Sequence, residues 1–386
     1  MRRPIPKRLP PSVHFDQFIR PIGSTLKNGP ELNSRGNRPL KMDFEEQLRI
    51  LIYYHLQEFR SAQHLLQALK EDDFARQHIA PEQGIEKSSF SEAINNRGLK
   101  QMLHVFKELQ TQARDLLPRA HPELGPLVGI DGSLIDGSLS MLWADYRKGS
   151  QKAKVHVGFD LNRSIPRKVY LTDGKGGERP YVSKILSKDD TAVTDRGYQC
   201  HRLFDQWQKD GQLFICRIKE GTHKKILSHN TAPADNSIVF FDSTVLLGTP
   251  GVNQSHTPLR LVGYEVDRVK YWIATNRHDL TGEQIAQAYK LRWNIENFFA
   301  WWKRHLKVYH LIARTPYGLM VQILAGLITY LLLAIHCHNH YQEKVSIRRV
   351  RELRTAIENE LRLMADEDCN ESNVEKHKLQ TFDAKT

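Results

Sequence analysis

The chain has 386 residues, of which 40% are hydrophobic and 26% charged, so it can bury a core that needs no disulfide or metal staple. Four cysteines, none of them in a CxxC pair, do not suggest a disulfide framework and fit a reducing compartment. The net charge of +12 points to a polyanionic partner, of which nucleic acid is the commonest and an anionic membrane surface the main rival.

The N-terminal third of the chain divides into a basic arm and a helical region. Residues 1–41 are rich in Pro, Arg and Lys, and we expect a flexible arm there. Over residues 42–120 the apolar side chains recur at helical spacing, which predicts a small helical domain. Such domains are a usual form of DNA-recognition module, and a plain helical cap is the alternative. The spacing is carried by Phe44, Leu48, Leu51, Leu65, Leu69, Leu99, Met102, Phe106 and Leu109.

Two short apolar runs beyond residue 126 each lead directly into an acid. Residues 127–130 precede Asp131 and residues 191–194 precede Asp195, and a glycine follows each acid within two positions. Each run predicts a buried strand with the acid at its C-terminal end. Asp136, which also precedes a glycine, is the alternative first acid.

The elements around these runs have a definite order. Strands come first and then alternate with helices, which is the order of a ribonuclease-H-like sheet. We therefore expect an α/β fold of this kind over residues 121–340. The further predicted elements are strands at 154–161 and 167–172, helices at 179–186 and 201–209, and a strand at 213–218.

Residues 219–278 break this alternation. They contain β-rich runs at 237–247, 259–266 and 270–274, separated by turn residues and without a helical period. The stretch predicts an all-β insertion within the α/β domain.

Three helices are expected in the C-terminal part. Thr281 and Gln284 have capping-box spacing, and the helix that they begin should run to about Lys307. Residues 318–337 are nearly continuous apolar sequence, long enough to span a bilayer. We expect a buried core helix there, and a membrane span is the alternative. Residues 341–386 predict an amphipathic helix followed by a polar tail.

The first of these helices carries Tyr289, Arg292, Glu296 and Lys303. At 100° per residue, these four positions lie within roughly 60° of one another. The spacing predicts a narrow polar stripe with one acid between two cations, and a solvated stripe with an Arg–Glu pair is the alternative. The opposite side is apolar and carries Leu291, Ile295, Phe298, Trp301 and Trp302.

Asp131, Asp195 and Glu296 converge if this helix packs across the sheet, because the two strand ends are neighbours in a ribonuclease-H-like fold. Three carboxylates without cations between them repel strongly, and a divalent metal relieves that repulsion. Oxygen ligands favour Mg²⁺ or Mn²⁺, and two such ions about 3.5–4 Å apart serve in-line phosphoryl displacement. Asp160 is an accessory ligand in one interpretation and a turn former in the preferred one.

The polar stripe has the fixed spacing Y-x2-R-x3-E-x6-K, and two acid motifs precede it. In this combination the chain resembles the prokaryotic insertion-sequence transposases of the DDE class, in the subgroup with that signature. The resemblance covers roughly residues 126–335, and a β-rich stretch before the third acid is also typical of the subgroup. It is carried by Tyr289, Arg292, Glu296 and Lys303, by Asp131-Gly132-Ser133 and Asp195-Arg196-Gly197-Tyr198, and by the strand at 214–219.

The resemblance implies DNA transposition by a ribonuclease-H-like catalytic domain. The reaction is hydrolysis at the transposon ends, followed by attack of the freed 3′-OH on target DNA. It implies two Mg²⁺ ions, which Mn²⁺ can replace. The implied site residues are Asp131, Asp195 and Glu296 as catalytic metal ligands, and Tyr289, Arg292 and Lys303 as contacts to DNA phosphates.

Trp293 is a candidate base-stacking residue, because a flipped base needs an aromatic platform, and core packing is the alternative. The implied partners are double-stranded DNA, as transposon ends and target, and a second copy of the chain, since two ends must be joined. The expected setting is the prokaryotic cytoplasm, at the nucleoid, without a membrane partner. The alternative function is that of an inactive relative which regulates by binding DNA.

Overall fold

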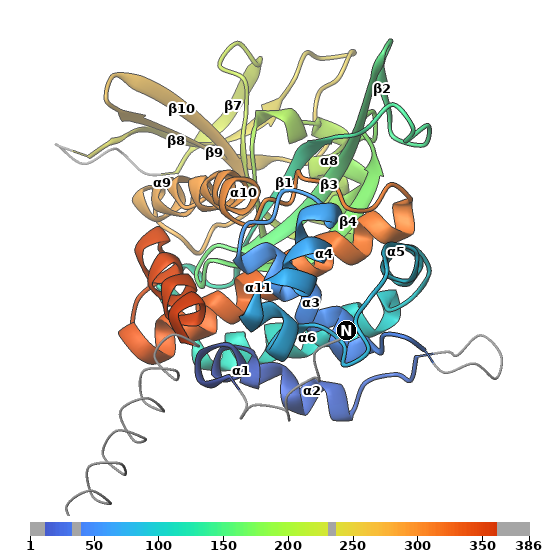
Figure 1. Cartoon of the computed structure of the whole chain (residues 1–386). Helices are drawn as coiled ribbons and strands as arrows, with labels where there is room; N and C mark the ends of the chain where they lie inside the picture. Colours follow the sequence, from blue (N-terminus) through green and yellow to red (C-terminus); the bar gives the residue numbers. More distant parts are fainter. Residues whose placement is uncertain (1–11, 33–39, 231–236, 361–386) are drawn as a thin grey trace, which may run out of the picture. The chain divides into compact units, whose positions relative to one another are not determined.

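The computed structural model describes residues 12–32, 40–230 and 237–360 of the chain. The chain forms two compact units (Figure 1). One contains the residues up to 112 and from 302 onward, and the other contains residues 113–301. All strands of the described residues belong to the second unit.

A mixed sheet runs through the unit of residues 113–301. Across the described strands its order is β2-β3-β1-β5-β6-β10-β9-β8-β7, and β4 pairs with β3. The strands are β1 (Leu127–Asp136), β2 (Asp145–Arg147), β3 (Ser150–Asp160), β4 (Ile165–Asp173), β5 (Thr191–Thr194), β6 (Leu213–Arg217), β7 (Lys224–His229), β8 (Val239–Leu247), β9 (Leu259–Val266) and β10 (Val269–Thr275). The helices of this unit are η3 (Pro122–Leu124), η4 (Arg179–Tyr181), α7 (Val182–Ile185), η5 (Arg196–Tyr198), α8 (His201–Lys209), α9 (Gly282–Lys290) and most of α10 (Trp293–His305).

The centre of the sheet is parallel. β1 pairs with β5, and β5 pairs with β6, in parallel, whereas β3 and β4 extend the sheet antiparallel from the other edge of β1. β5 and β6 are short and mostly buried, as expected of strands covered on both faces. The fold is therefore the predicted mixed α/β class, and the strands predicted at 154–161, 167–172 and 213–218 are confirmed as β3, β4 and β6.

Alternating side chains of β1 face two different sets of helical residues. Val128 and Ile130 belong to a core that includes aromatic side chains of α8. Gly129 faces the other side, where a Cβ on this residue would lie 3.6 Å from Ile295 Cγ2 of α10. Successive strand residues point to opposite faces, so α8 and α10 cover opposite faces of β1.

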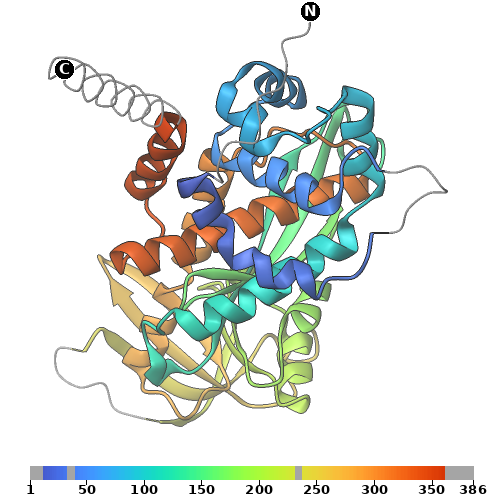
Figure 2. The ribbon, with the colours of Figure 1, turned by 60° about the horizontal axis from the view of Figure 1, so that its bottom comes forward.

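Strands β7 to β10 form an antiparallel meander that continues the sheet beyond β6 (Figure 2). The runs predicted at 237–247, 259–266 and 270–274 are confirmed as β8, β9 and β10. Strand β7 has no predicted counterpart, because its exposed, lysine-containing sequence lacks a buried apolar alternation.

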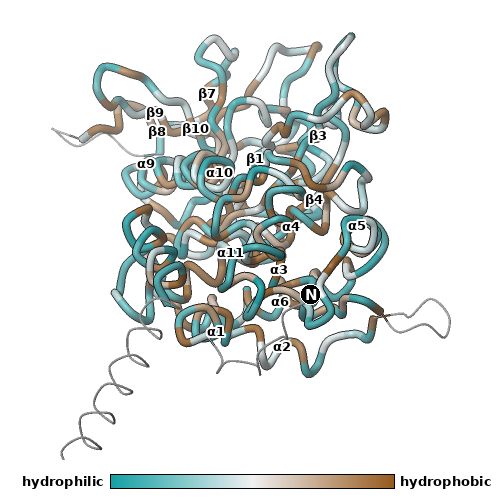
Figure 3. Tube along the Cα trace, in the orientation of Figure 1, coloured by the Kyte–Doolittle hydropathy of each residue, from teal (hydrophilic) through white to brown (hydrophobic). Residues whose placement is uncertain are grey.

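Helix α11 (Pro316–Tyr341) is the core of the other unit. It packs against α1, α3 and α5, and 94% of its most apolar stretch is buried inside the protein, although its length and composition alone would suit a membrane (Figure 3). The apolar sequence at 318–337 is therefore a buried core helix. The other helices of this unit are α1 (Val13–Ile19), η1 (Arg20–Ile22), α2 (Gly23–Lys27), α3 (Phe44–Leu56), α4 (Ala62–Glu71), the π-helical turn η2 (Ala75–Ile79), α5 (Lys87–Asn96), most of α6 (Leu99–Leu116) and a helix over 347–360.

The flexible arm predicted over residues 1–41 is corrected where the structure describes it. Residues 13–27 form α1, η1 and α2, and Phe15, Phe18 and Ile22 are at most 2% exposed. These residues recur three and four positions apart, so they make one apolar helix face within a Pro- and Arg-rich sequence. Residues 1–11 and 33–39 of the predicted arm, and the predicted polar tail after residue 360, lie outside the described residues.

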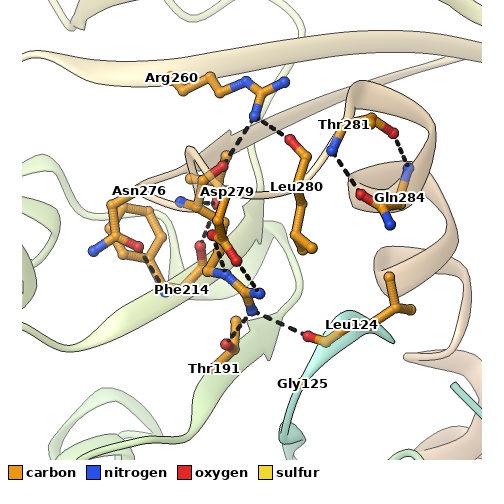
Figure 4. Close-up of polar contacts among 12 residues, drawn as sticks. Leu124, Gly125, Thr191, Phe214, Arg260, Asn276, Asp279, Leu280, Thr281 and Gln284 are labelled. Atoms are coloured by element: carbon orange, nitrogen blue, oxygen red, sulfur yellow. Dashed lines mark hydrogen bonds and ion pairs between the residues drawn. The ribbon is translucent and has the colours of Figure 1, made fainter. Parts of the chain in front are cut away.

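Two buried arginines connect the meander and the start of α9 to β5 (Figure 4). Arg260 on β9 donates to both carboxylate oxygens of Asp242, at 2.9 and 2.6 Å. It also donates to the carbonyl oxygens of Arg277, at 3.0 Å, and Leu280, at 2.6 Å. Arg277 in turn donates to Thr191 Oγ1 at 2.7 Å. The segment that leads into α9 is therefore held against the strand that precedes Asp195.

Substitution of Arg260 tests this connection. Arg260→Ala leaves the Asp242 carboxylate, whose side chain is 4% exposed, buried without its bidentate partner. We expect the free energy of unfolding to fall by about 3–5 kcal/mol, measured by urea denaturation of the full chain. Lys175→Ala is the control, because it breaks an ion pair with Asp145 whose side chains are 58% and 57% exposed, and it should cost no more than about 1 kcal/mol. Equal losses in the two variants would contradict a structural role for the buried pair.

Candidate active site

Asp131 and Asp195 come from neighbouring parallel strands, Asp131 within β1 and Asp195 directly after β5. β1 pairs with β5 in a register that ends at Gly129↔Val193. Each acid lies two residues beyond this last pair, at the point where β5 ends. Asp195 is accordingly among the charges that act on Asp131.

A glycine N–H anchors each of the two carboxylates. Asp131 Oδ1 accepts from the N–H of Gly132 at 2.8 Å. Asp195 Oδ1 accepts from the N–H of Gly197 at 2.8 Å, which caps η5. The glycines noted in the sequence therefore hold the acids in place.

Asp131 does not end its strand, contrary to the prediction. β1 continues to Asp136 because its other edge pairs with β3 throughout, with Asp131 opposite Val157. Only the parallel pairing with β5 stops before the acid. Asp136, the alternative first acid, is five positions further and so points to the other face of the strand. Its side chain is 82% exposed and pairs with Lys152 at 2.5 Å.

Asp160 acts as a turn former. Its Oδ1 accepts from the N–H groups of Asn162 and Arg163, both at 3.0 Å. Asp160 lies opposite Val128, at the end of the β1–β3 ladder away from Asp136, so it serves the turn rather than the acids.

The helix predicted to carry the third acid is two helices. α9 and α10 meet at Leu291 and Arg292, where the sequence predicts one continuous helix. The hydrogen bonds tighten there to i→i+3, since the N–H of Arg292 donates to Tyr289 O at 3.0 Å and the N–H of Asn294 donates to Leu291 O at 2.9 Å. The regular rotation that defined the polar stripe does not hold across this break. The predicted capping box at the start of α9 is present.

Three of the four signature residues gather at this break. Arg292 donates from Nη2 to Glu296 Oε1 at 2.5 Å, and its guanidinium carbon lies 5.6 Å from the centre of the Tyr289 ring. Tyr289 and Arg292 are 4% and 8% exposed. Among the charges that act on Asp131, Arg292 is the cation, so the cluster at the break acts electrostatically on Asp131.

Glu296 belongs to the helix that covers the Asp131 side of the sheet. Ile295, its neighbour, packs over Gly129. Gly129 and Asp131 share one face of β1, because residues two apart in a strand point the same way. The three acids nevertheless do not form a closed metal site: among the described residues, no three acidic, histidine or cysteine side chains are grouped so that they could hold an ion.

Trp293 and Lys303 lie at opposite ends of α10. Trp293 begins the helix and is 57% exposed, so it does not pack in the core. Lys303 belongs to the last turn and is half-buried. The break before α10 therefore turns Arg292 inward and Trp293 outward.

Glu178 is a further acid at this site, and the sequence pattern gives no reason to select it. A Cβ on Gly132 would lie 2.7 Å from Glu178 Oε1, so this carboxylate lies against the backbone next to Asp131. Lys154 Nζ is 3.4 Å from the same oxygen. In the sequence, Glu178 only closes a glycine-rich loop after β4, and no local spacing relates it to Asp131.

The charges around Asp131 fit a divalent cation. Burial, together with the carboxylates of Glu178 and Asp195, raises the pKa of Asp131 to about 7, although the N–H of Gly132 and the Arg292 guanidinium act in the opposite direction. A cation between the carboxylates would relieve this crowding. Since all the donors are carboxylate oxygens, they suit Mg²⁺ or Mn²⁺ better than softer metals.

Proteins with similar sequences are named as transposases. One, from Geobacillus stearothermophilus, is a probable transposase for insertion sequence element IS5377, 28% identical over 54% of this chain and 56% of its own length. Another, y4zB from Sinorhizobium fredii, is 29% identical over 50% of this chain and 56% of its own length. A third, for element IS4SA of Synechocystis sp., is 24% identical over 65% of this chain and 72% of its own length. The matched stretch thus spans little more than half of the first two relatives.

A family model described as a transposase DDE domain matches residues 126–332, which is more than half of the chain. This stretch begins just before β1 and ends within α11, so it includes both strand acids and both helices of the signature. The chain belongs to the prokaryotic insertion-sequence transposases with a DDE domain.

Proposed function

We propose that this transposase cleaves DNA at the ends of its element and joins the freed 3′-OH groups to target DNA, with Asp131, Asp195 and Glu296 as its catalytic, metal-binding triad. The chain would belong to the subgroup with the Y-x2-R-x3-E-x6-K signature. Its ribonuclease-H-like catalytic domain would cover residues 121–340, with the β7–β10 meander, at about 219–278, as an all-β insertion.

The observation that carries the proposal is the position of the strand acids beneath α10. Asp131 and Asp195 each lie two residues beyond the last pair of the β1–β5 ladder, and Ile295 packs over Gly129 on the Asp131 face of β1. Glu296 is the next residue after Ile295, so the third acid of the signature belongs to the helix that covers this pair.

The proposed chemistry divides between metal and protein. Two Mg²⁺ ions bound by the triad would activate the attacking oxygen and stabilise the leaving oxygen of an in-line displacement. Arg292 holds Glu296 through the 2.5 Å hydrogen bond, and its planar donors also suit a phosphate of the bound DNA. Tyr289 and Lys303 are the other proposed phosphate contacts.

Trp293 is proposed to stack on a base displaced near the cleaved end. Its exposure of 57% leaves the side chain accessible from solvent. An exposed aromatic ring provides the platform on which an unpaired base can stack.

Further parts of the chain have proposed roles. The helical region at 42–120 would recognise double-stranded DNA, and the basic balance of +12 would favour binding to both transposon ends and target. A second copy of the chain would join the complex, because two ends must be brought together. The C-terminal part at 341–386 would contribute an amphipathic helix to this assembly, in the prokaryotic cytoplasm.

Removal of each acid tests the triad. Asp131→Ala, Asp195→Ala and Glu296→Ala should each slow Mg²⁺-dependent cleavage of end DNA by about 10³-fold or more, because metal ions supply several kcal/mol of transition-state stabilisation. Binding to the same DNA should persist. Nicking of labelled end DNA in Mg²⁺ and in EDTA measures the first effect, and gel retardation measures the second.

Asp136→Ala is the matched control, since this acid lies on the same strand but is exposed and faces away; it should cleave like the wild type. Cleavage at the normal rate by a triad variant would remove that acid from the proposal. A wild-type chain that binds end DNA but cleaves it in no divalent metal would instead be the inactive, DNA-binding regulator.

The raised pKa of Asp131 predicts how stability depends on pH. The folded chain holds the Asp131 proton up to about pH 7, whereas the ordinary pKa is 3.8. The metal-free chain should therefore lose stability as the pH rises from about 4 to about 7, by up to about 1.4 kcal/mol per pH unit from this residue. Asp131→Asn should lack this component. Urea denaturation in EDTA at several pH values measures it, and identical pH profiles for the two proteins would refute the crowding of Asp131.

Substitution of Trp293 tests the stacking role. Trp293→Ala should weaken productive binding of end DNA by about 5- to 150-fold, the equivalent of about 1–3 kcal/mol for one stacked base. Trp293→Phe should retain most of the activity, and both variants should melt like the wild type because the side chain is exposed. Cleavage rates, and fluorescence of 2-aminopurine at the terminal bases, provide the measurements. An alanine variant with wild-type rates and an unchanged fluorescence signal would exclude stacking.

A further inference from the structure

Glu178 approaches the acid pair from a different element than Glu296. It follows β4 and immediately precedes η4. Its Oε1 lies so close to Gly132 that a Cβ on this residue would be only 2.7 Å from the oxygen. β5 does not extend past Thr194, so β1 has no parallel neighbour beside Asp131 and Gly132. The space next to the acids is therefore accessible to a side chain from this segment.

Hydrogen bonds hold the Glu178 segment on both sides. Lys154 on β3 donates to Gly176 O at 3.0 Å. Arg179 donates to Gly197 O at 2.9 Å and to Gln199 O at 3.1 Å. The segment is thus tied to the strand next to β1 and to the loop that follows Asp195. This double attachment keeps the Glu178 backbone close to both strand acids.

The pairing of Glu178 with Lys154 is loose. The distance between Lys154 Nζ and Glu178 Oε1 is 3.4 Å, longer than the roughly 2.7–2.9 Å of a strong charge-assisted hydrogen bond. A single ammonium at this distance competes weakly with a divalent cation for the carboxylate. The Glu178 side chain can therefore exchange its lysine for an ion.

A buried hydroxyl lies beside these carboxylates. Tyr198 is 1% exposed, and its hydroxyl makes only a poorly aligned hydrogen bond to Glu178. Burial raises the pKa of Tyr198, and the charges of Glu178, Asp131 and Asp195 add to this effect. The hydroxyl therefore lies among the same three acids that the Glu178 segment brings together.

We propose that Glu178 is a fourth carboxylate of the metal centre and shares a divalent ion with Asp131 and Asp195 when the carboxylates close on that ion. This inference rests on the proposed metal-dependent function. Together with Glu296, the centre would then contain four carboxylates. Their formal charge of −4 would balance the charge of two divalent cations.

Binding of Mn²⁺ to the full chain tests the inference without any cleavage assay. Electron paramagnetic resonance measures free Mn²⁺ in titrations of the wild type, Asp131→Asn and Glu178→Gln. Glu178→Gln should bind Mn²⁺ about 10- to 100-fold more weakly than the wild type. Asp131→Asn should show a loss of at least the same size. Glu265→Gln, which removes an exposed acid of β9, is the control and should bind like the wild type.

Two further variants separate a metal ligand from a structural acid. If Glu178 served only as the partner of Lys154, then Lys154→Met and Glu178→Gln would have the same effect. A metal ligand instead predicts that Lys154→Met binds Mn²⁺ at least as tightly as the wild type. Gly132→Ala, which displaces the carboxylate without removing it, should weaken binding even if Glu178→Gln fails to fold.

Thermal unfolding gives an independent measurement. Mn²⁺ should raise the melting temperature of the wild type, because a ligand that binds only the folded state stabilises it. Glu178→Gln should melt no lower than the wild type in EDTA but should gain less from Mn²⁺. A lower melting temperature in EDTA with an unchanged gain from Mn²⁺ would mean that Glu178 is structural, and the inference would fail.

The outcomes also distinguish this inference from the proposed function. If Glu178→Gln binds Mn²⁺ with wild-type affinity and Asp131→Asn does not, then Glu178 is not a metal ligand. The proposed triad would be unaffected by this result. Wild-type affinity in both variants, or no Mn²⁺ binding by the wild type, would overturn the proposed metal centre and the fourth ligand together.

Discussion

Repulsion between carboxylates that the sheet holds together is the constraint on which the other features of the site depend. Asp131 and Asp195 each lie two residues beyond the last pair of the β1–β5 ladder, and Glu178 lies against Gly132, the residue after Asp131. Burial and these neighbours raise the pKa of Asp131 to about 7. The nearby cation, Arg292, is already hydrogen-bonded to Glu296. These carboxylates therefore form an unfavourable charge cluster, which the surrounding sheet, the glycine N–H groups and the buried arginine pairs have to offset.

The parts of this site that follow from the sequence are those with a local pattern. Asp131 and Asp195 each follow a short apolar run, and the signature residues have a fixed spacing. Glu178 has neither, because its relation to Asp131 arises from a contact between segments 46 positions apart. The helices at 13–27 escape detection for a different reason: the Pro- and Arg-rich composition conceals the spacing of Phe15, Phe18 and Ile22. The course of β1 beyond Asp131 depends on its pairing with β3, which no single run of residues reveals.

The break between α9 and α10 is also not predicted by the spacing of residues, and it determines how Arg292 and Trp293 are exposed. A periodicity of 100° assumes an unbroken helix, whereas i→i+3 hydrogen bonds at Leu291 and Arg292 change the rotation at that point. The result is that Arg292 is 8% exposed and the adjacent Trp293 is 57% exposed. A cation directed at the acids and an aromatic ring directed at solvent thus come from consecutive residues. The tight turn therefore places these two consecutive side chains in different surroundings, one buried near the acids and the other exposed to solvent.

The meander of β7 to β10 lies between Asp195 and Glu296 in the sequence, and its two ends are fixed close to each other. The chain leaves the parallel core at the end of β6 and returns on β10, and these two strands pair with each other, from Ile273↔Arg217 to Thr275↔Ile215. Entry and exit are therefore adjacent. Arg277, just after β10, hydrogen-bonds to Thr191 at the start of β5, and Arg260 of β9 hydrogen-bonds to the carbonyl oxygens of Arg277 and Leu280. The start of α9 is therefore tied both to the parallel core and to the meander. The buried pair of Arg260 with Asp242 of β8 fixes the meander side of this connection, so the segment that leads to Glu296 is held from two directions.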